Sequence, residues 1–109
     1  MMNNLERIFK LEQLGKLPSE QSQEIDDFPL DEFDQLLQSF DLPITLEMAK
    51  RLIRLSPPSE SGCFGMEWAI LSLIESLDIK QLQALIHHAD KNEVVDLITI
   101  RLENYFKNE

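Results

Sequence analysis

The stretch CFGMEWAILSLIESL, residues 63–77, is apolar on nearly every side when it is drawn as a helix. Its apolar residues recur at intervals of three and four positions, which is the spacing of one helical face. The only polar strip consists of Ser72, Glu75 and Ser76, and it is flanked by Trp68. A helix this apolar is usually the most buried one in a domain. We therefore expect residues 63–77 to form a central helix that other helices surround.

Amphipathic helical patterns lie on both sides of this segment. Thr45, Asp78 and Asn92 each precede such a pattern and are good N-cap residues, and Ser19 could cap a further short helix. Gly15 and Pro18 are expected to end the first helix. The expected helices besides the central one are residues 3–14, a short segment after Ser19, and residues 30–40, 46–56, 79–89 and 93–106.

The apolar residues of the terminal helices indicate which sides face the core. In the first helix they are Leu5, Ile8, Phe9 and Leu11, and in the last helix they are Val95, Ile98, Leu102, Tyr105 and Phe106. No strand pattern is convincing, and the connection PPSESG, residues 57–62, is too short to be a domain linker. The sequence predicts an all-α fold in a single domain over residues 1–109. It has six to seven short antiparallel helices, arranged as a bundle or as HEAT-like helical pairs.

Composition and charge restrict the class of protein. The chain has 109 residues, of which 43% are hydrophobic and 28% are charged, as in ordinary globular proteins. The single cysteine, Cys63, cannot form a disulfide within the chain. From the sequence pattern we expect neither a leader nor a membrane-spanning segment. We expect a cytoplasmic protein. The net charge of −10 disfavours binding to nucleic acid or to an anionic membrane surface.

The negative charge is concentrated in one part of the chain. Between Lys16 and Lys50 the sequence has no lysine or arginine, but it has nine carboxylates: Glu20, Glu24, Asp26, Asp27, Asp31, Glu32, Asp34, Asp41 and Glu47. Solvated helices usually intersperse opposite charges at i+4, which relieves repulsion. One interpretation is a well-solvated surface that keeps the protein in solution. The other, which we prefer, is a surface that is complementary to a cationic protein.

Sequence patterns of catalytic sites are absent. His87 and His88 are adjacent, so on a helix they point about 100° apart and cannot hold one metal ion together. Cys63 has no histidine near it in the sequence, and the chain contains no glycine-rich phosphate loop, zinc spacing or nucleophile elbow. We expect no enzymatic activity, no cofactor and no metal.

Residues 44–77, ITLEMAKRLIRLSPPSESGCFGMEWAILSLIESL, resemble a small helical family of bacterial immunity proteins. These proteins are the antidotes of polymorphic toxins, including those of contact-dependent growth inhibition systems. The similar elements are LIRLSPP, an acidic loop and GMEWAILSLIES, and the closing DLITIRLENYF places Arg101 and Asn104 as in the family's last helix. The resemblance covers about residues 28–106. One departure is Ser72, where the family pattern has a histidine.

The resemblance implies a stoichiometric inhibitor that covers a toxin, often a nuclease with a cationic cleft. On this hypothesis Asp26, Asp27, Asp31, Glu32 and Asp34 supply the electrostatic surface, Glu60 adds a charge from the loop, and Trp68 and Glu75 contribute from the central helix. Two alternatives remain open. One is a helical adaptor that binds an endogenous basic protein, and the other is a regulator that mimics nucleic acid.

Overall fold

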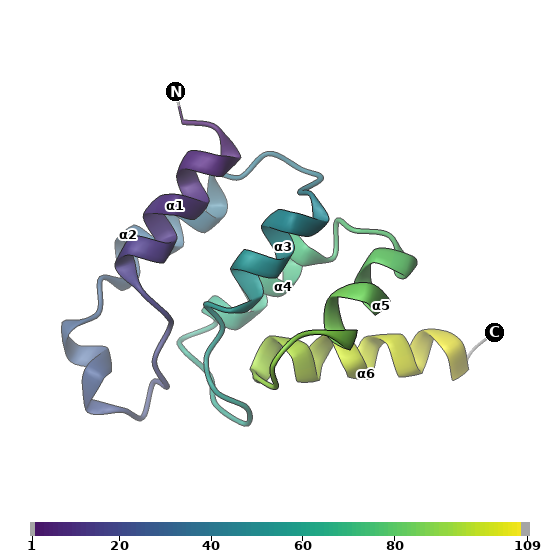
Figure 1. Ribbon diagram of the computed structural model, residues 1–109. Helices are drawn as coiled ribbons and strands as arrows, with labels where there is room; N and C mark the ends of the chain where they lie inside the picture. Colours follow the sequence, from purple (N-terminus) through teal and green to yellow (C-terminus); the bar gives the residue numbers. More distant parts are fainter. Residues whose placement is uncertain (1, 108–109) are drawn as a thin grey trace.

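The chain folds into three successive pairs of α-helices (Figure 1). The computed structural model describes residues 2–107. The helices are α1 (Asn4–Leu14), α2 (Leu30–Gln38), α3 (Leu46–Ile53), α4 (Met66–Ile74), α5 (Ile79–His87) and α6 (Glu93–Lys107), and the 3₁₀ helix η1 (Gln23–Asp27) precedes α2. The described residues contain no strand. The prediction of an all-α fold with six to seven helices is confirmed.

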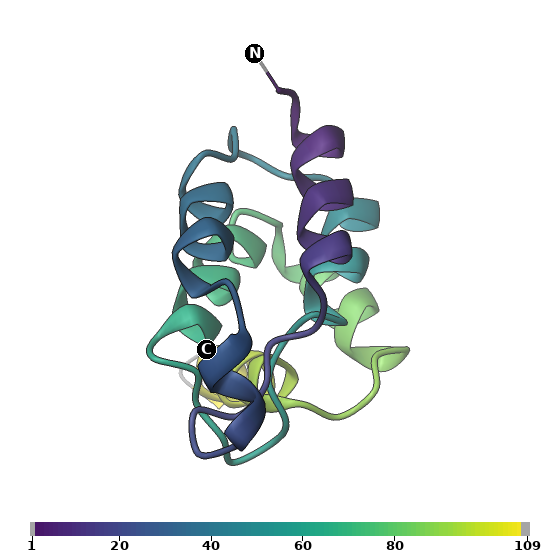
Figure 2. The ribbon, with the colours of Figure 1, turned by 90° about the vertical axis from the view of Figure 1, so that its left-hand side faces the viewer.

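The six helices form two layers. Helix α3 contacts both α1 and α5 in one layer, and α4 contacts both α2 and α6 in the other. Figure 2 shows α1, α3 and α5 on one side of the molecule and α2 and α4 on the other, with α6 across the lower end. Each layer therefore takes one helix from every pair, as in the predicted HEAT-like arrangement.

Helix α4 is central, as the apolar pattern predicts. Its side chains at Ile70, Leu71, Leu73 and Ile74 are buried, and it contacts α2, α3 and α6. Its polar strip is also where it was expected, because Trp68, Ser72 and Glu75 are exposed. Ser76 is half-buried, and its hydroxyl accepts the Ile44 N–H at 3.1 Å and donates to the Leu73 carbonyl at 2.7 Å. A residue that looked like solvated surface thus holds the loop before α3.

Three of the four predicted N-caps are confirmed. The side chains of Thr45, Asp78 and Asn92 accept backbone N–H groups in the first turns of α3, α5 and α6. The prediction of Ser19 as a cap is wrong, since residues 20–21 form a turn, but the short helix expected after it is present as η1. The cap of η1 is Ser22, whose hydroxyl accepts the Glu24 N–H at 3.2 Å.

Some apolar residues of the terminal helices do not face the core. In α1, Ile8 and Leu11 are buried, but Leu5 and Phe9 are exposed. In α6, Val95, Ile98 and Leu102 are buried, whereas Tyr105 and Phe106 are about half exposed, contrary to expectation. The last turn of α6 extends beyond the helices it packs on (Figure 1), so nothing in the described structure covers it fully.

The connection between α3 and α4, residues 54–65, joins the three pairs. On one side, the Leu17 N–H donates to the Leu55 carbonyl at 2.9 Å, and the Glu20 N–H donates to the Gly62 carbonyl at 2.8 Å. On the other side, the Glu93 N–H donates to the Pro57 carbonyl at 3.0 Å. These bonds fix both outer pairs to the connection of the middle pair.

Asn92 reinforces the same junction from inside the protein. This residue is buried, its Nδ2 donates to the Ile53 carbonyl at 2.8 Å, and its Oδ1 accepts the Val95 N–H at 3.0 Å. One amide group therefore satisfies the end of α3 and caps the start of α6.

Replacing Asn92 with alanine should destabilise the fold. The change leaves the Val95 N–H without its cap and removes the side-chain donor to Ile53, so we expect the free energy of unfolding to fall by about 2 kcal/mol. Urea denaturation measures the effect. The control is Asn104→Ala at an exposed position of the same helix, which should change stability by less than about 0.5 kcal/mol. Equal effects of the two variants would contradict the role of Asn92.

Candidate functional site

One segment of the chain carries a run of carboxylates that form no ion pair among the described residues. Of the nine in the basic-free stretch, Asp41 pairs with Arg7 at 3.3 Å and Glu47 pairs with Lys50 at 3.4 Å. The seven others form no ion pair within residues 2–107, and they are Glu20, Glu24, Asp26, Asp27, Asp31, Glu32 and Asp34. All seven precede or belong to η1 and α2. The negative charge of this segment is uncompensated inside the chain.

Five of the predicted binding residues are here. We call Asp26, Asp27, Asp31, Glu32 and Asp34 the acidic surface. Asp26 and Asp27 are exposed on η1, Asp31 and Glu32 are exposed in the first turn of α2, and Asp34 is half-buried. In Figure 2, η1 lies at the front of the molecule, below α2. The acidic surface is therefore accessible to a macromolecule.

The fold accounts for part of this charge. Asp31 and Glu32 lie at the N-terminus of α2, where the helix dipole favours negative side chains, and Pro29 provides no side-chain cap there. Asp34 accepts two hydrogen bonds of 3.0 Å from the Gln38 amide. Asp26 and Asp27 have no such compensation in the described structure.

Aromatic side chains adjoin the acidic surface. A hollow of about 620 Å³, which we call the aromatic hollow, is lined by Ile25, Asp26, Phe28, Pro29, Leu30, Asp31, Glu32 and Phe64. Phe28 packs on the buried Phe33, with ring centroids 5.7 Å apart, whereas Phe64 is 60% exposed. The hollow thus combines apolar walls with three carboxylates, and such a combination suits the stem and charged head of a lysine or arginine side chain.

The loop before α4 holds Phe64 in this place. Phe64 has φ of 49° and Gly65 has φ of 85°, so two successive residues adopt the left-handed region where α4 begins. A bulky residue seldom adopts this conformation. Four residues after Phe64, in the first turn of α4, Trp68 is 53% exposed. The structure thus places Trp68 on the surface, beside the polar strip predicted for the central helix.

Two predicted residues are not part of the acidic surface. Glu75 is paired with Arg101 at 3.1 Å, so its charge is compensated. Glu60 has φ of 62° in the connection between α3 and α4, and it does not line the aromatic hollow. Both residues are exposed, but neither belongs to η1 or α2, which carry the acidic surface.

A second group of carboxylates lies around the connection between α3 and α4. Glu67 is buried, and its Oε1 accepts the Cys63 N–H at 2.9 Å, which closes the turn into α4. Burial and the charges of Asp96, Glu67 and Glu60 raise the pKa of the Glu93 carboxyl above its usual value. Among these carboxylates, Glu67 serves the geometry of the loop, because it satisfies a backbone donor that faces the interior.

Cys63 is fully buried in this environment. Burial, followed by the charges of Glu67 and Glu20, raises the pKa of the Cys63 thiol to about 11. Because the thiolate is the reactive form, the structure disfavours Cys63 as a nucleophile. Over residues 2–107 no cluster of three histidine, cysteine or carboxylate side chains has the arrangement of a metal site. No helix in that range has both the length and the apolarity required to cross a bilayer.

Sequence reasoning missed the aromatic walls of the hollow. Phe28 and Phe64 are separated by 35 intervening positions, and only the fold brings them to one surface. A local signal for Phe64 was its position directly before Gly65, at the expected start of the central helix. A bulky residue beside a turn glycine is often held outward.

Comparisons with known proteins identify no relative. No family model and no curated protein matches the sequence, and no solved structure matches the fold.

The buried thiol leads to a prediction about reactivity. With a pKa of about 11 in place of its ordinary value of 9.0, the thiolate fraction at neutral pH falls about 100-fold. Alkylation of Cys63 by iodoacetamide should be slower in the folded protein by at least that factor than in the urea-unfolded chain. Mass spectrometry over time measures both rates. A native rate close to the unfolded rate would show that Cys63 is accessible and ionised.

Proposed function

We propose that this chain binds a basic protein through the acidic surface and the aromatic hollow, and that it neutralises this partner as a stoichiometric inhibitor. The observation that carries the proposal is the set of seven successive carboxylates, from Glu20 to Asp34, that form no ion pair within residues 2–107, beside the exposed ring of Phe64. Uncompensated charge destabilises a fold slightly, and complementarity to a cationic partner is a physical reason to retain it.

The finer proposal is that the partner is a toxin domain and the chain its immunity protein. The resemblance of residues 28–106 to helical immunity proteins supports this, and so does the physics of the task. Attraction between opposite charges can raise association rates to about 10⁸–10⁹ M⁻¹s⁻¹ at low salt. An antidote must bind before its toxin acts, so rapid association is useful to it.

In this proposal the charged and the aromatic side chains act on different steps of binding. The acidic surface would accelerate encounter, because carboxylates at a rim act mainly on the association rate. Phe64 and Trp68 would slow dissociation, since large aromatic side chains that become desolvated at an interface dominate binding energy. This combination distinguishes a tight inhibitor from a purely electrostatic mimic of nucleic acid.

Growth rescue tests the function directly. Co-expression of the chain with toxin domains that are encoded next to it should restore growth against one of them. Rescue should require the chain in at least equal amount, as expected for an inhibitor that acts by binding. Failure to rescue against every neighbouring toxin domain would contradict the immunity proposal. A complex that persists above about 0.5 M salt would further exclude a purely electrostatic mimic.

Reversing one charge of the acidic surface should slow association with the toxin domain against which the chain restores growth. For Asp31→Lys we expect the association rate constant at low salt to fall about three- to tenfold, with a smaller effect at high salt. Stopped-flow mixing measures this rate. The matched control is Glu103→Lys, which makes the same charge change at an exposed position of α6. If the two variants slow association equally, only net charge matters and the acidic surface is not the contact.

Removing an aromatic anchor should act on dissociation instead. Trp68→Ala and Phe64→Ala should each raise the dissociation rate constant about 30-fold or more, as expected for interface residues worth about 2 kcal/mol. Phe9→Ala is the control, because Phe9 is 57% exposed but lies on α1, whereas both anchors lie at the start of α4. Surface plasmon resonance separates the two rates, and an unchanged dissociation rate in both anchor variants would place the interface elsewhere.

A further inference from the structure

Cationic side chains gather around a second hollow of the molecule. This hollow has a volume of about 370 Å³ and is lined by Lys16, Lys50, Ile53, Arg54, Leu85, His88, Ala89, Asp90, Lys91 and Asn92. We call it the basic hollow. Its lining holds four lysine or arginine residues against one carboxylate, although the whole chain has twice as many carboxylates as cations. In a protein of net charge −10, such a local excess of positive charge is unexpected.

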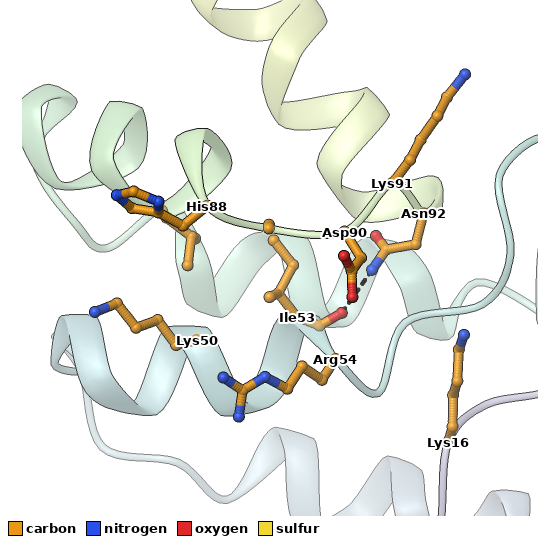
Figure 3. Close-up of a pocket in the computed structure, with 10 residues that line it drawn as sticks. Lys16, Lys50, Ile53, Arg54, His88, Asp90, Lys91 and Asn92 are labelled. Atoms are coloured by element: carbon orange, nitrogen blue, oxygen red, sulfur yellow. Dashed lines mark hydrogen bonds between the residues drawn. The ribbon is translucent and has the colours of Figure 1, made fainter.

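The cations come from elements that are distant in the sequence. Lys50 and Arg54 are one turn apart along α3, and Figure 3 shows their side chains extending in the same direction. His88 faces them from the end of α5, and Lys16 lies on the far side of the hollow. Lys91 points away from the others (Figure 3). The central group is therefore Lys50, Arg54 and His88.

These side chains are not used by the fold. Lys16, Arg54 and Lys91 form no ion pair with any described residue, and Lys50 has only an exposed contact of 3.4 Å with Glu47. Glu12, whose carboxylate also feels the charge of Arg54, is paired with Arg51 instead. An exposed pair such as Lys50–Glu47 is weak and easily exchanged for another anion.

The cations are not needed to satisfy the end of α3 either. The Leu52 carbonyl accepts the Leu55 N–H at 2.9 Å, and the Ile53 carbonyl accepts the Asn92 amide at 2.8 Å. Asp90, the only carboxylate of the lining, forms no ion pair with Lys50, Arg54 or any other described cation. The donors of Lys50, Arg54 and His88 thus remain available to a ligand.

We propose that the basic hollow binds a small phosphate ester. Lysine and arginine are the usual partners of phosphate oxygens, and arginine adds a planar pair of donors. The buried Ile53 and Leu85 in the lining would contact the organic part of the ligand. The ligand is small because the hollow has the volume of a small-molecule site and because the net charge of the chain repels extended polyanions such as nucleic acid. This proposal is independent of the toxin partner.

Inorganic pyrophosphate is the probe for the full-length chain. Nuclear magnetic resonance at constant ionic strength should show saturable shifts of backbone amides, concentrated in residues 50–54 and 88–92. Citrate, a carboxylate anion of similar charge, should bind at least several-fold more weakly. Shifts that are spread over all cations without saturation, or equal binding of citrate, would overturn the proposal of a phosphate site.

Substitution tests the residues. Lys50→Gln combined with Arg54→Gln should weaken pyrophosphate binding at least about tenfold, because each charged hydrogen bond contributes about that factor. The charge-matched control combines Lys80→Gln with Lys107→Gln at exposed positions outside the hollow. Arg54→Lys should give an intermediate loss and tests the planar donor pair without a change in charge. Equal weakening in the control variant would mean that only net charge matters, which contradicts the site.

Discussion

The structure depends on the backbone hydrogen bonds made by the connection between α3 and α4. Leu55 and Gly62 accept from the segment that follows α1, and Pro57 accepts from the first residue of α6. Because α1 does not contact α5 or α6 directly to any large extent, this connection fixes the first helix pair relative to the last. Leu55 and Pro57 are buried, so their backbone carbonyls need partners, and these hydrogen bonds supply them.

The same connection places the two charged regions of the molecule. The bond from Glu20 to Gly62 holds the start of the acidic segment against the loop that carries Phe64, which completes the aromatic hollow. The bond from Asn92 to Ile53 holds the loop after α5 against the end of α3, which completes the basic hollow. Acidic and basic side chains are therefore separated by the fold, and most of them do not neutralise one another.

Features that depend only on nearby residues could be predicted from the sequence. Burial could not be predicted where it depends on which neighbouring helices cover a side chain. Thr45, Asp78 and Asn92 could be recognised as caps because a cap acts within one helical turn. The burial of α4 followed from its apolar surface on all sides. Tyr105 and Phe106 were predicted to be buried because periodicity identifies the face of a helix, but it does not indicate where the neighbouring helices end.

The candidate site shows the same division. The acidic surface could be predicted, since its carboxylates are close in sequence and no cation interrupts them. The aromatic hollow could not be predicted, because Phe64 lies in a loop with positive φ values and joins residues that are distant in the sequence. The basic hollow was missed for a similar reason, as Lys16, Arg54 and His88 come from three separate segments.

The charges of the acidic surface differ in how much the fold explains them. Asp31 and Glu32 stabilise the N-terminus of α2, and Asp34 is engaged by Gln38, so an isolated domain has reasons to keep all three. Asp26 and Asp27 on η1 have no corresponding role, because a short 3₁₀ helix has little dipole to offset and no cation lies within bonding distance in the described structure. The proposed binding function is therefore supported most strongly by the charges of η1. If a basic partner docks here, its cations should meet Asp26 and Asp27 first, with the aromatic hollow taking the apolar contact beside them.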